Sequence, residues 1–162
     1  MAEAKAPEAP PPEQDPGAQP GAQVDPFRAY NFKLLIDGVN EGHFTQFDGL
    51  HAKVEVIPYR EGGGGTVVRK LAGPLRLGEV TLRYGLTRSS DLWTWFQASV
   101  SGQPQRKNVS VLMLAMDGVT EVLRWNLLEA WPSEWHGAPL DALGQLVAIE
   151  SLVITFESFN RG

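Results

Sequence analysis

The stretch Pro58–Lys70, Pro-Tyr-Arg-Glu-Gly-Gly-Gly-Gly-Thr-Val-Val-Arg-Lys, decides how the fold of this 162-residue chain is interpreted. It places four consecutive glycines between two segments with strand-like patterns, His51–Tyr59 and Thr66–Leu71. Ordering a glycine costs roughly 0.5–1 kcal/mol more than ordering an alanine. The pattern therefore predicts a long β-hairpin whose glycine tip is either mobile or held by a neighbouring molecule.

The N-terminal 24 residues differ sharply in composition from the rest of the chain. Met1–Val24 contains six prolines, no Leu, Ile or Phe, and a net charge of −3 out of the total of −5. Such a segment buries too little apolar surface to offset its chain entropy, so we predict a disordered or polyproline-like appendage. It lacks the apolar stretch of a signal peptide. Asp25–Gly162 is predicted to form one folded domain.

The remaining pattern within this domain is mostly that of antiparallel strands. Alternation of polar and apolar residues, together with Asp-Gly turns, predicts further strands over Tyr30–Asp37, His43–Phe47, Glu79–Thr87, Asn108–Met116 and Glu121–Ala130. One helix is predicted after Ser89 or Ser90, with an apolar stripe that includes Leu92 and Trp95 and a stop at Gly102. Many strands with one helix indicate a mainly β fold, an antiparallel sandwich or barrel.

The last predicted strand, Gln145–Phe159, contains a change of parity. Val147 and Ile149 share one phase, whereas Leu152, Ile154 and Phe156 share the other. Side chains alternate with period two along a strand, so one ideal strand cannot bury both sets on the same side. We therefore expect either a bulge near Glu150-Ser151 or a strand that leaves one sheet and joins another.

The residues of an active site are not evident in this pattern. The chain has no cysteine, and His43, His51 and His136 form no pair at metal-ligand spacing. No Lys-Ser/Thr pair or helix follows the glycines as in a phosphate-binding loop. We predict no cofactor, no metal and no enzymatic activity. The slightly acidic domain argues against a general nucleic-acid binder, and no apolar run approaches the roughly 20 residues of a membrane span.

The five tryptophans are predicted to have two kinds of role. Trp95 and Trp125 are interpreted as core or rim residues of the fold. Trp131 and Trp135 lie in a stretch that is less strand-like, Trp131-Pro132-Ser133-Glu134-Trp135. Tryptophan is enriched where proteins contact one another, so we predict that these two aromatic side chains anchor an interface.

Several segments, taken in order, resemble the tube proteins of contractile phage tails and of related bacterial contractile injection systems. The resemblance covers essentially all of Asp25–Phe159, and no single segment carries it alone. Its segments are Asp25–Arg28 with Asn31-Phe32, Phe47–Leu50, Tyr59–Gly63, Val68–Gly73, Thr81–Gly85, Asp91–Trp95, Arg124–Asn126, Ala130–Ser133 and Ala148–Leu152. Met1–Val24 lies outside it.

The resemblance implies a structural subunit of the inner tube, one that contributes to a larger barrel in a hexameric ring. Rings stack head to tail inside a contractile sheath, and DNA or effector protein passes through the bore. The implied partners are further copies of this chain, the sheath, the baseplate and the tail terminator. Assembly in the cytoplasm into a tail or tail-like particle is expected, without stable membrane association; release from the cell and the choice between phage and bacterial particle stay open.

Two sets of residues are predicted to act in such an assembly. Contacts between rings or subunits are assigned to Arg60, Glu61, Gly62, Gly63, Gly64, Gly65, Arg69, Lys70, Trp131 and Trp135. The bore-facing set is Lys53, Glu55, Thr81 and Arg83, although these residues would equally suit the solvent face of a monomer. The alternative function is a monomeric β-barrel module that binds a sugar or peptide.

Overall fold

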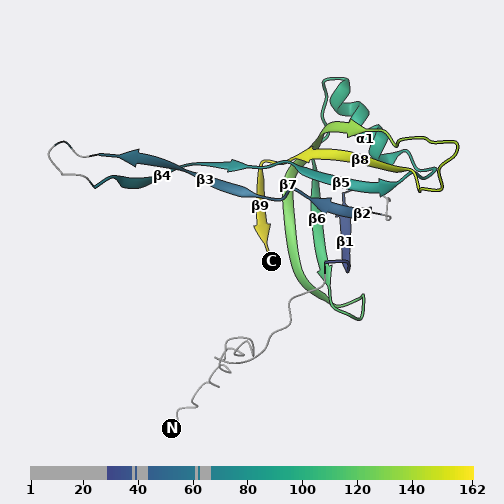
Figure 1. The fold of residues 1–162 in the computed structure, drawn as a ribbon, viewed down its shortest axis with the longest axis horizontal. Helices are drawn as coiled ribbons and strands as arrows, with labels where there is room; N and C mark the ends of the chain where they lie inside the picture. Colours follow the sequence, from purple (N-terminus) through teal and green to yellow (C-terminus); the bar gives the residue numbers. More distant parts are fainter. Residues whose placement is uncertain (1–28, 38, 40–43, 61, 63–66) are drawn as a thin grey trace, which may run out of the picture.

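The computed structural model describes residues 29–37, 39, 44–60, 62 and 67–162, and within them it contains nine strands and one helix (Figure 1). The predictions for Met1–Val24, Glu61 and Gly63–Gly65 lie outside the described residues. The mainly β, antiparallel fold predicted from the sequence is confirmed. The elements are β1 Phe32–Ile36, β2 Phe44–Asp48, β3 Ala52–Tyr59, β4 Arg69–Leu77, β5 Val80–Gly85, α1 Asp91–Val100, β6 Lys107–Leu114, β7 Glu121–His136, β8 Ile149–Thr155 and β9 Ser158–Arg161.

One long strand, β7, belongs to both layers of the fold. Its first half pairs with β6 and β9, and its second half pairs with β8, which continues the sheet to β5 and β2. The strand changes partners around Glu129, a non-glycine residue with a φ of 55°. Such a backbone conformation is uncommon outside glycine and turns the chain sharply. β7 is therefore the bent element that joins the two layers.

The hydrophobic core lies between these two layers and under the helix. Leu82, Leu152 and Ile154 come from the β2–β5–β8–β7 layer, and Val109 and Leu127 from the other; all five are fully buried. The helix contributes Leu92 and Trp95, and the Trp95 indole Nε1 donates a hydrogen bond to the Gln105 carbonyl at 2.6 Å. The predicted helix and the predicted core role of Trp95 are thus confirmed.

The predicted bulge at Glu150-Ser151 is wrong, because β8 pairs with β5 in unbroken register from Ile149 to Ile154. The expected change of sheet does occur, but further on, where β8 ends at Thr155 and β9 begins at Ser158. The side chain of Ile149 points to the outer face of the sheet, opposite to Leu152 and Ile154. It is half-buried there beside the chain that precedes β8. β8 therefore carries Ile149 on one face and Leu152 and Ile154 on the other, whereas Val147 precedes the strand and Phe156 follows it.

Candidate assembly surface

Strands β3 and β4 form a separate two-stranded ribbon that projects away from the two-layered body (Figure 1). We call this ribbon, Ala52–Tyr59 with Arg69–Leu77, the arm. Of the elements of the described chain, each arm strand packs extensively only against the other. A two-stranded ribbon that packs against no further strand or helix is only marginally stable in water. The arm therefore has the form of an element whose packing partner is another molecule.

One face of the arm is almost entirely apolar, and the ribbon contains one bulge. Between the pairs Val54↔Leu75 and Val56↔Ala72, β3 advances by two residues and β4 by three, so the extra residue lies at Gly73-Pro74. Beyond the shift, Ala72 and Lys70 lie opposite Val56 and Pro58 on one face, and Leu71 lies opposite Ile57 on the other. Val56 on this face is 60% exposed. The face comprises Ala52, Val54, Val56, Pro58, Ala72, Leu75 and Leu77, with Lys70 near its outer end.

The opposite face of the arm is polar near the body. Lys53 pairs with Arg76 across the strands, and Arg76 forms an ion pair with Glu55. Further out, the same face carries the exposed apolar pair Ile57 and Leu71, followed by Tyr59 opposite Arg69. The structure therefore brings together on the arm several residues that the sequence analysis had assigned to two different surfaces.

A pair of glycines lies where the arm joins the body. Gly49 has a φ of +90°, and a Cβ added there would lie 2.5 Å from the Glu79 carbonyl oxygen. On the other chain segment, a Cβ on Gly78 would overlap the His51 ring, whose Nδ1 lies 3.0 Å from the Gly49 oxygen. The Gly78 amide donates to the His51 carbonyl at 2.9 Å. This hinge sets the direction in which the arm leaves, and the sequence showed only the Asp48-Gly49 turn.

The charge of the arm region differs from that of the rest of the domain. Residues 52–77 hold five basic and two acidic side chains, whereas residues 78–162 hold six basic and nine acidic ones. Arg60 and Gly62, predicted contact residues, are exposed beyond the end of β3. A basic projection on an acidic body favours contact with the body of another molecule.

The four residues predicted to face a bore lie in two different sheets. Thr81 and Arg83 belong to β5 and alternate with the buried Val80, Leu82 and Tyr84, so they lie on the outer face of the body. Their cross-strand partners include Gln46, Asp48 and Ser151. Lys53 and Glu55 lie on the arm instead. The outer face is thus polar around Arg83 and toward β2, whereas on the β8 side Thr81 pairs with the buried Val153.

Trp131 and Trp135 are part of β7, so the prediction that this stretch is less strand-like is wrong. The second half of β7 is an edge that pairs only with β8, where Pro132 is tolerated. The Trp135 ring lies 4.8 Å from that of Trp93 on α1, which in turn lies 5.8 Å from Phe96. These aromatic rings gather between α1 and β7, so the structure does not place them with the arm.

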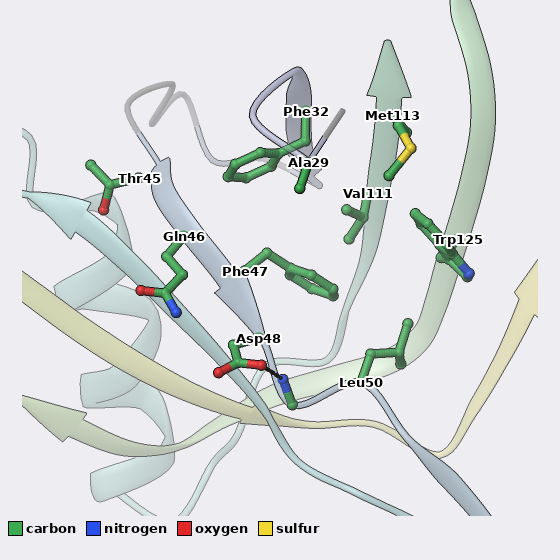
Figure 2. Close-up of a pocket in the computed structure, with 11 residues that line it drawn as sticks. Ala29, Phe32, Thr45, Gln46, Phe47, Asp48, Leu50, Val111, Met113 and Trp125 are labelled. Atoms are coloured by element: carbon green, nitrogen blue, oxygen red, sulfur yellow. Dashed lines mark hydrogen bonds between the residues drawn. The ribbon is translucent and has the colours of Figure 1, made fainter. Parts of the chain in front are cut away.

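A groove between β2 and the other layer was not identified from the sequence. It has a volume of about 530 Å³ and is lined mostly by apolar side chains (Figure 2). Its lining includes Phe32, Phe47, Val111, Met113 and Trp125, so the core or rim role predicted for Trp125 is a rim role. The sequence signal for this groove was the apolar alternation that includes Phe32 and Phe47. That alternation predicts that the two side chains face inward, but it does not predict a groove between the layers.

The titratable groups with shifted pKa values lie together at the β6–β7 turn. A hydrogen bond from the Thr120 hydroxyl, with others from backbone amides, lowers the pKa of Asp117. The Arg124 guanidinium donates to Glu121 at 2.6 and 2.8 Å, which lowers the pKa of Glu121 and raises the pKa of Arg124. All three are surface groups in hydrogen-bonded pairs, which is the ordinary cause of such shifts.

The described residues show neither a cluster of metal ligands nor a helix that could span a membrane. Across the described ranges, no group of three or more His, Asp or Glu side chains is placed to hold a metal ion. In the same part of the chain, no helix is long and apolar enough to cross a membrane.

Comparisons with known proteins agree on one class. Residues 28–160 match the family described as T4-like virus tail tube protein gp19. The structure of the anti-feeding prophage (AFP) baseplate, six-fold symmetrised, contains a chain 25% identical, with a TM-score of 0.73, covering 86% of this chain and 97% of that one. No curated protein matches.

Two further structures share the fold at lower identity. The sheath–tube complex of the extracellular contractile injection system PVC, in its extended state, contains a chain 22% identical with a TM-score of 0.75, covering 85% of this chain and 91% of that one. Hcp1 from Flavobacterium johnsoniae is 17% identical, with a TM-score of 0.50 and coverage of 81% and 94%.

The matched family, the two-layered β fold and the projecting arm together define a structural tube protein of contractile tails and injection systems. The chain belongs to the T4-like tail tube protein family. This membership places it among tube proteins rather than among ligand-binding β-barrel modules.

Proposed function

We propose that this chain forms hexameric rings that stack head to tail into a hollow tube, with the arm as a main contact between copies. The observation that carries the proposal is the apolar face of the arm, on which Val54, Val56 and Leu75 are at least half exposed. Fully burying a Val or Leu side chain contributes about 1.5–3 kcal/mol relative to full exposure. Several half-exposed side chains on one ribbon therefore supply a substantial driving force for association.

Ring closure is proposed to use the β2–β5–β8–β7 layer. This layer ends in β2 on one side and in the second half of β7 on the other. Unpaired strand edges attract further strands, and a closed barrel removes them. Six copies joined edge to edge would turn the outer face of β5, with Thr81 and Arg83, toward a common bore. Lys53 and Glu55, on the polar face of the arm, would extend this lining toward the next ring.

The residues around the arm tip are proposed to contact the adjacent ring. Arg60, Gly62, Arg69 and Lys70 lie at or near the outer end of the arm, and Glu61 and Gly63–Gly65 complete this set in sequence. Exposed ion pairs contribute only about 0–1 kcal/mol each, so repetition around a ring would supply their effect. Trp131 and Trp135 are proposed as anchors of a second contact, on the β7 side of the body.

The wider assembly follows from the tube role. We propose that sheath, baseplate and terminator proteins contact the tube, as the similar structures are a baseplate, a cap and sheath–tube complexes. The cargo would be DNA or an effector protein passing through the polar bore. Assembly would take place in the cytoplasm before the particle acts outside the cell.

An arm variant tests this function. Val54→Ser, Val56→Ser and Leu75→Ser, combined in one chain, remove apolar surface that is already exposed, so the subunit should fold normally. Negative-stain electron microscopy should show rings or tubes for the parent chain and a large loss of them for this variant. The matched control changes two exposed apolar residues at the β6–β7 turn, Met116→Ser with Val119→Ser. Parent protein that stays monomeric at every concentration and salt would contradict the proposal.

A further inference from the structure

A second apolar surface lies on the connection between β7 and β8. This connection, Gly137–Ala148, exposes four large apolar side chains: Leu140, Leu143, Leu146 and Val147. Leu143 and Leu146 are 95% and 96% exposed, which is more than any apolar side chain of the arm. Scattered exposed apolar residues are ordinary, but four within eight residues of one loop mark an interaction surface. We call this connection the leucine loop.

The leucine loop contains one hydrogen-bonded turn, and one further hydrogen bond ties its end to the body. The Leu143 amide donates to the Asp141 carboxylate at 3.0 Å, and the Gly144 amide donates to the Asp141 carbonyl at 3.2 Å. At its end, the Ala148 carbonyl accepts from the Leu86 amide at 2.9 Å. The loop covers a cavity of about 570 Å³ against Arg83, Ile149 and Ser151 on the outer face of the sheet. The loop therefore has a defined turn at Asp141 and an attached end at Ala148, with its leucines exposed.

The leucine loop and the arm lie at opposite ends of the same sheet. In the β5–β8 ladder, Val80 pairs with Ile154 at the end where the arm leaves, and Gly85 pairs with Ile149 at the end where the loop enters. Figure 1 shows the arm extending from one side of the body and the yellow-green connection before β8 on the other. A copy displaced along the strand direction would bring its arm to this loop.

We propose that the leucine loop of one copy receives the apolar face of the arm of the next copy in the stack. This inference rests on the proposed tube and names the surface that the arm occupies there. Two different surfaces of one chain meet, so the contact is heterologous and repeats without closing, as a filament requires. The basic arm also meets a part of the chain, residues 78–162, in which acidic residues outnumber basic ones.

Pairing of one arm with another arm is the less favourable arrangement. Such a contact would be self-complementary and would end at a dimer. It would also bring two basic ribbons together, since residues 52–77 carry five basic side chains against two acidic ones. Like charges placed opposite one another in a ladder are destabilising. The leucine loop meets the apolar requirement with its exposed leucines, and its one charged residue, Asp141, is acidic.

Disulfide trapping between copies tests the contact directly, because the chain has no cysteine of its own. Full-length Val56→Cys protein, carrying a size tag, is mixed with untagged Leu143→Cys protein under assembly conditions and mild oxidation. The mixed disulfide dimer, which has its own mass on a non-reducing gel, should be the main product. The matched control pairs Val56→Cys with Val119→Cys, an exposed position at the β6–β7 turn. Equal or greater dimer from the control pair would overturn the proposal.

A second variant separates this inference from the proposed function. Leu140→Ser, Leu143→Ser and Leu146→Ser in one chain should leave the circular dichroism spectrum and the thermal midpoint unchanged, because these side chains pack against little. The yield of sedimentable tubes should fall at least about tenfold, since burial of even one leucine is worth more than that factor. Parent tubes together with normal tubes from this variant would reject the loop contact alone, whereas a parent chain without tubes would reject the proposed function itself.

Discussion

The body and the arm of this protein use the same residue types in opposite ways. In the body, Val80, Leu82 and Leu152 are fully buried between two layers and a helix. In the arm, Val54, Val56 and Leu75 form an equally apolar face that stays exposed. The two layers and helix of the body bury their inward apolar side chains within one chain, whereas the arm does not. The difference shows that this fold separates the part that stabilises the subunit from the part that joins subunits.

Removal of a core side chain from the body should have the largest effect on the subunit itself. Trp95→Ala deletes a 1% exposed indole and its hydrogen bond to the Gln105 carbonyl. We expect the free energy of unfolding to fall by about 3–5 kcal/mol. Urea denaturation followed by circular dichroism measures this change. A loss below about 1 kcal/mol would mean that the core is not centred on this residue.

The hinge between the two regions should give the next largest effect. Gly49→Ala forces a side chain into a left-handed conformation and against the Glu79 carbonyl, and we expect a loss of about 1–3 kcal/mol. Gly62→Ala is the matched control near the arm tip, because a Cβ there meets no described atom within 4 Å. Chemical denaturation should separate the two variants clearly, and equal stability would show that the hinge tolerates other geometries.

Substitutions on the arm should leave the free subunit almost unchanged. The Val54→Ser, Val56→Ser, Leu75→Ser variant, measured under dilute conditions where copies stay apart, should differ from the parent by less than about 1 kcal/mol in unfolding free energy. A loss comparable with that of Trp95→Ala would mean that the arm packs on its own body, and the contrast between the two regions would collapse.

The smallest expected effect concerns pH and the β6–β7 turn. The pKa of Asp117 is lowered in the folded state, so its contribution to stability is present above the ordinary value of 3.8 and is lost as pH falls through the folded value. The difference in unfolding free energy between parent and Asp117→Ala should therefore shrink as the pH is lowered from about 7 to about 2. The Thr120→Val variant should show a weaker pH dependence of stability, because it lacks the hydroxyl that donates to Asp117. A stability difference between parent and Asp117→Ala that grows at low pH would contradict this prediction.

Local patterns found most elements but not their arrangement. The helix and the strands around Asp117-Gly118 follow from caps, periodicity and turn residues, and the structure has them. The extension of β7 to His136 and its bend at Glu129 were missed. The residues around Pro132 have no local pattern that predicts a strand. Their strand conformation depends on pairing with β8, which begins more than ten residues further along the chain.

The sequence predicted only part of the candidate contact surface, again because local patterns do not specify how distant strands pair. The glycine-rich stretch and its flanking charges are local signals, and they led to the arm residues Arg60, Arg69 and Lys70. The bulge at Gly73-Pro74, which moves Leu71 to the opposite face of the arm, depends on cross-strand register. The same holds for Lys53 and Glu55, which lie on the arm while Thr81 and Arg83 lie on the body.

The amino-acid order alone determined the fold class, the single helix, the projecting hairpin and the resemblance to tail tube proteins, because these depend on neighbours along the chain. The tertiary structure decided which apolar residues are buried. It showed that the leucine loop and the arm occupy opposite ends of one sheet, and that two glycines fix the angle between arm and body. These features depend on register between distant strands, which no local pattern specifies.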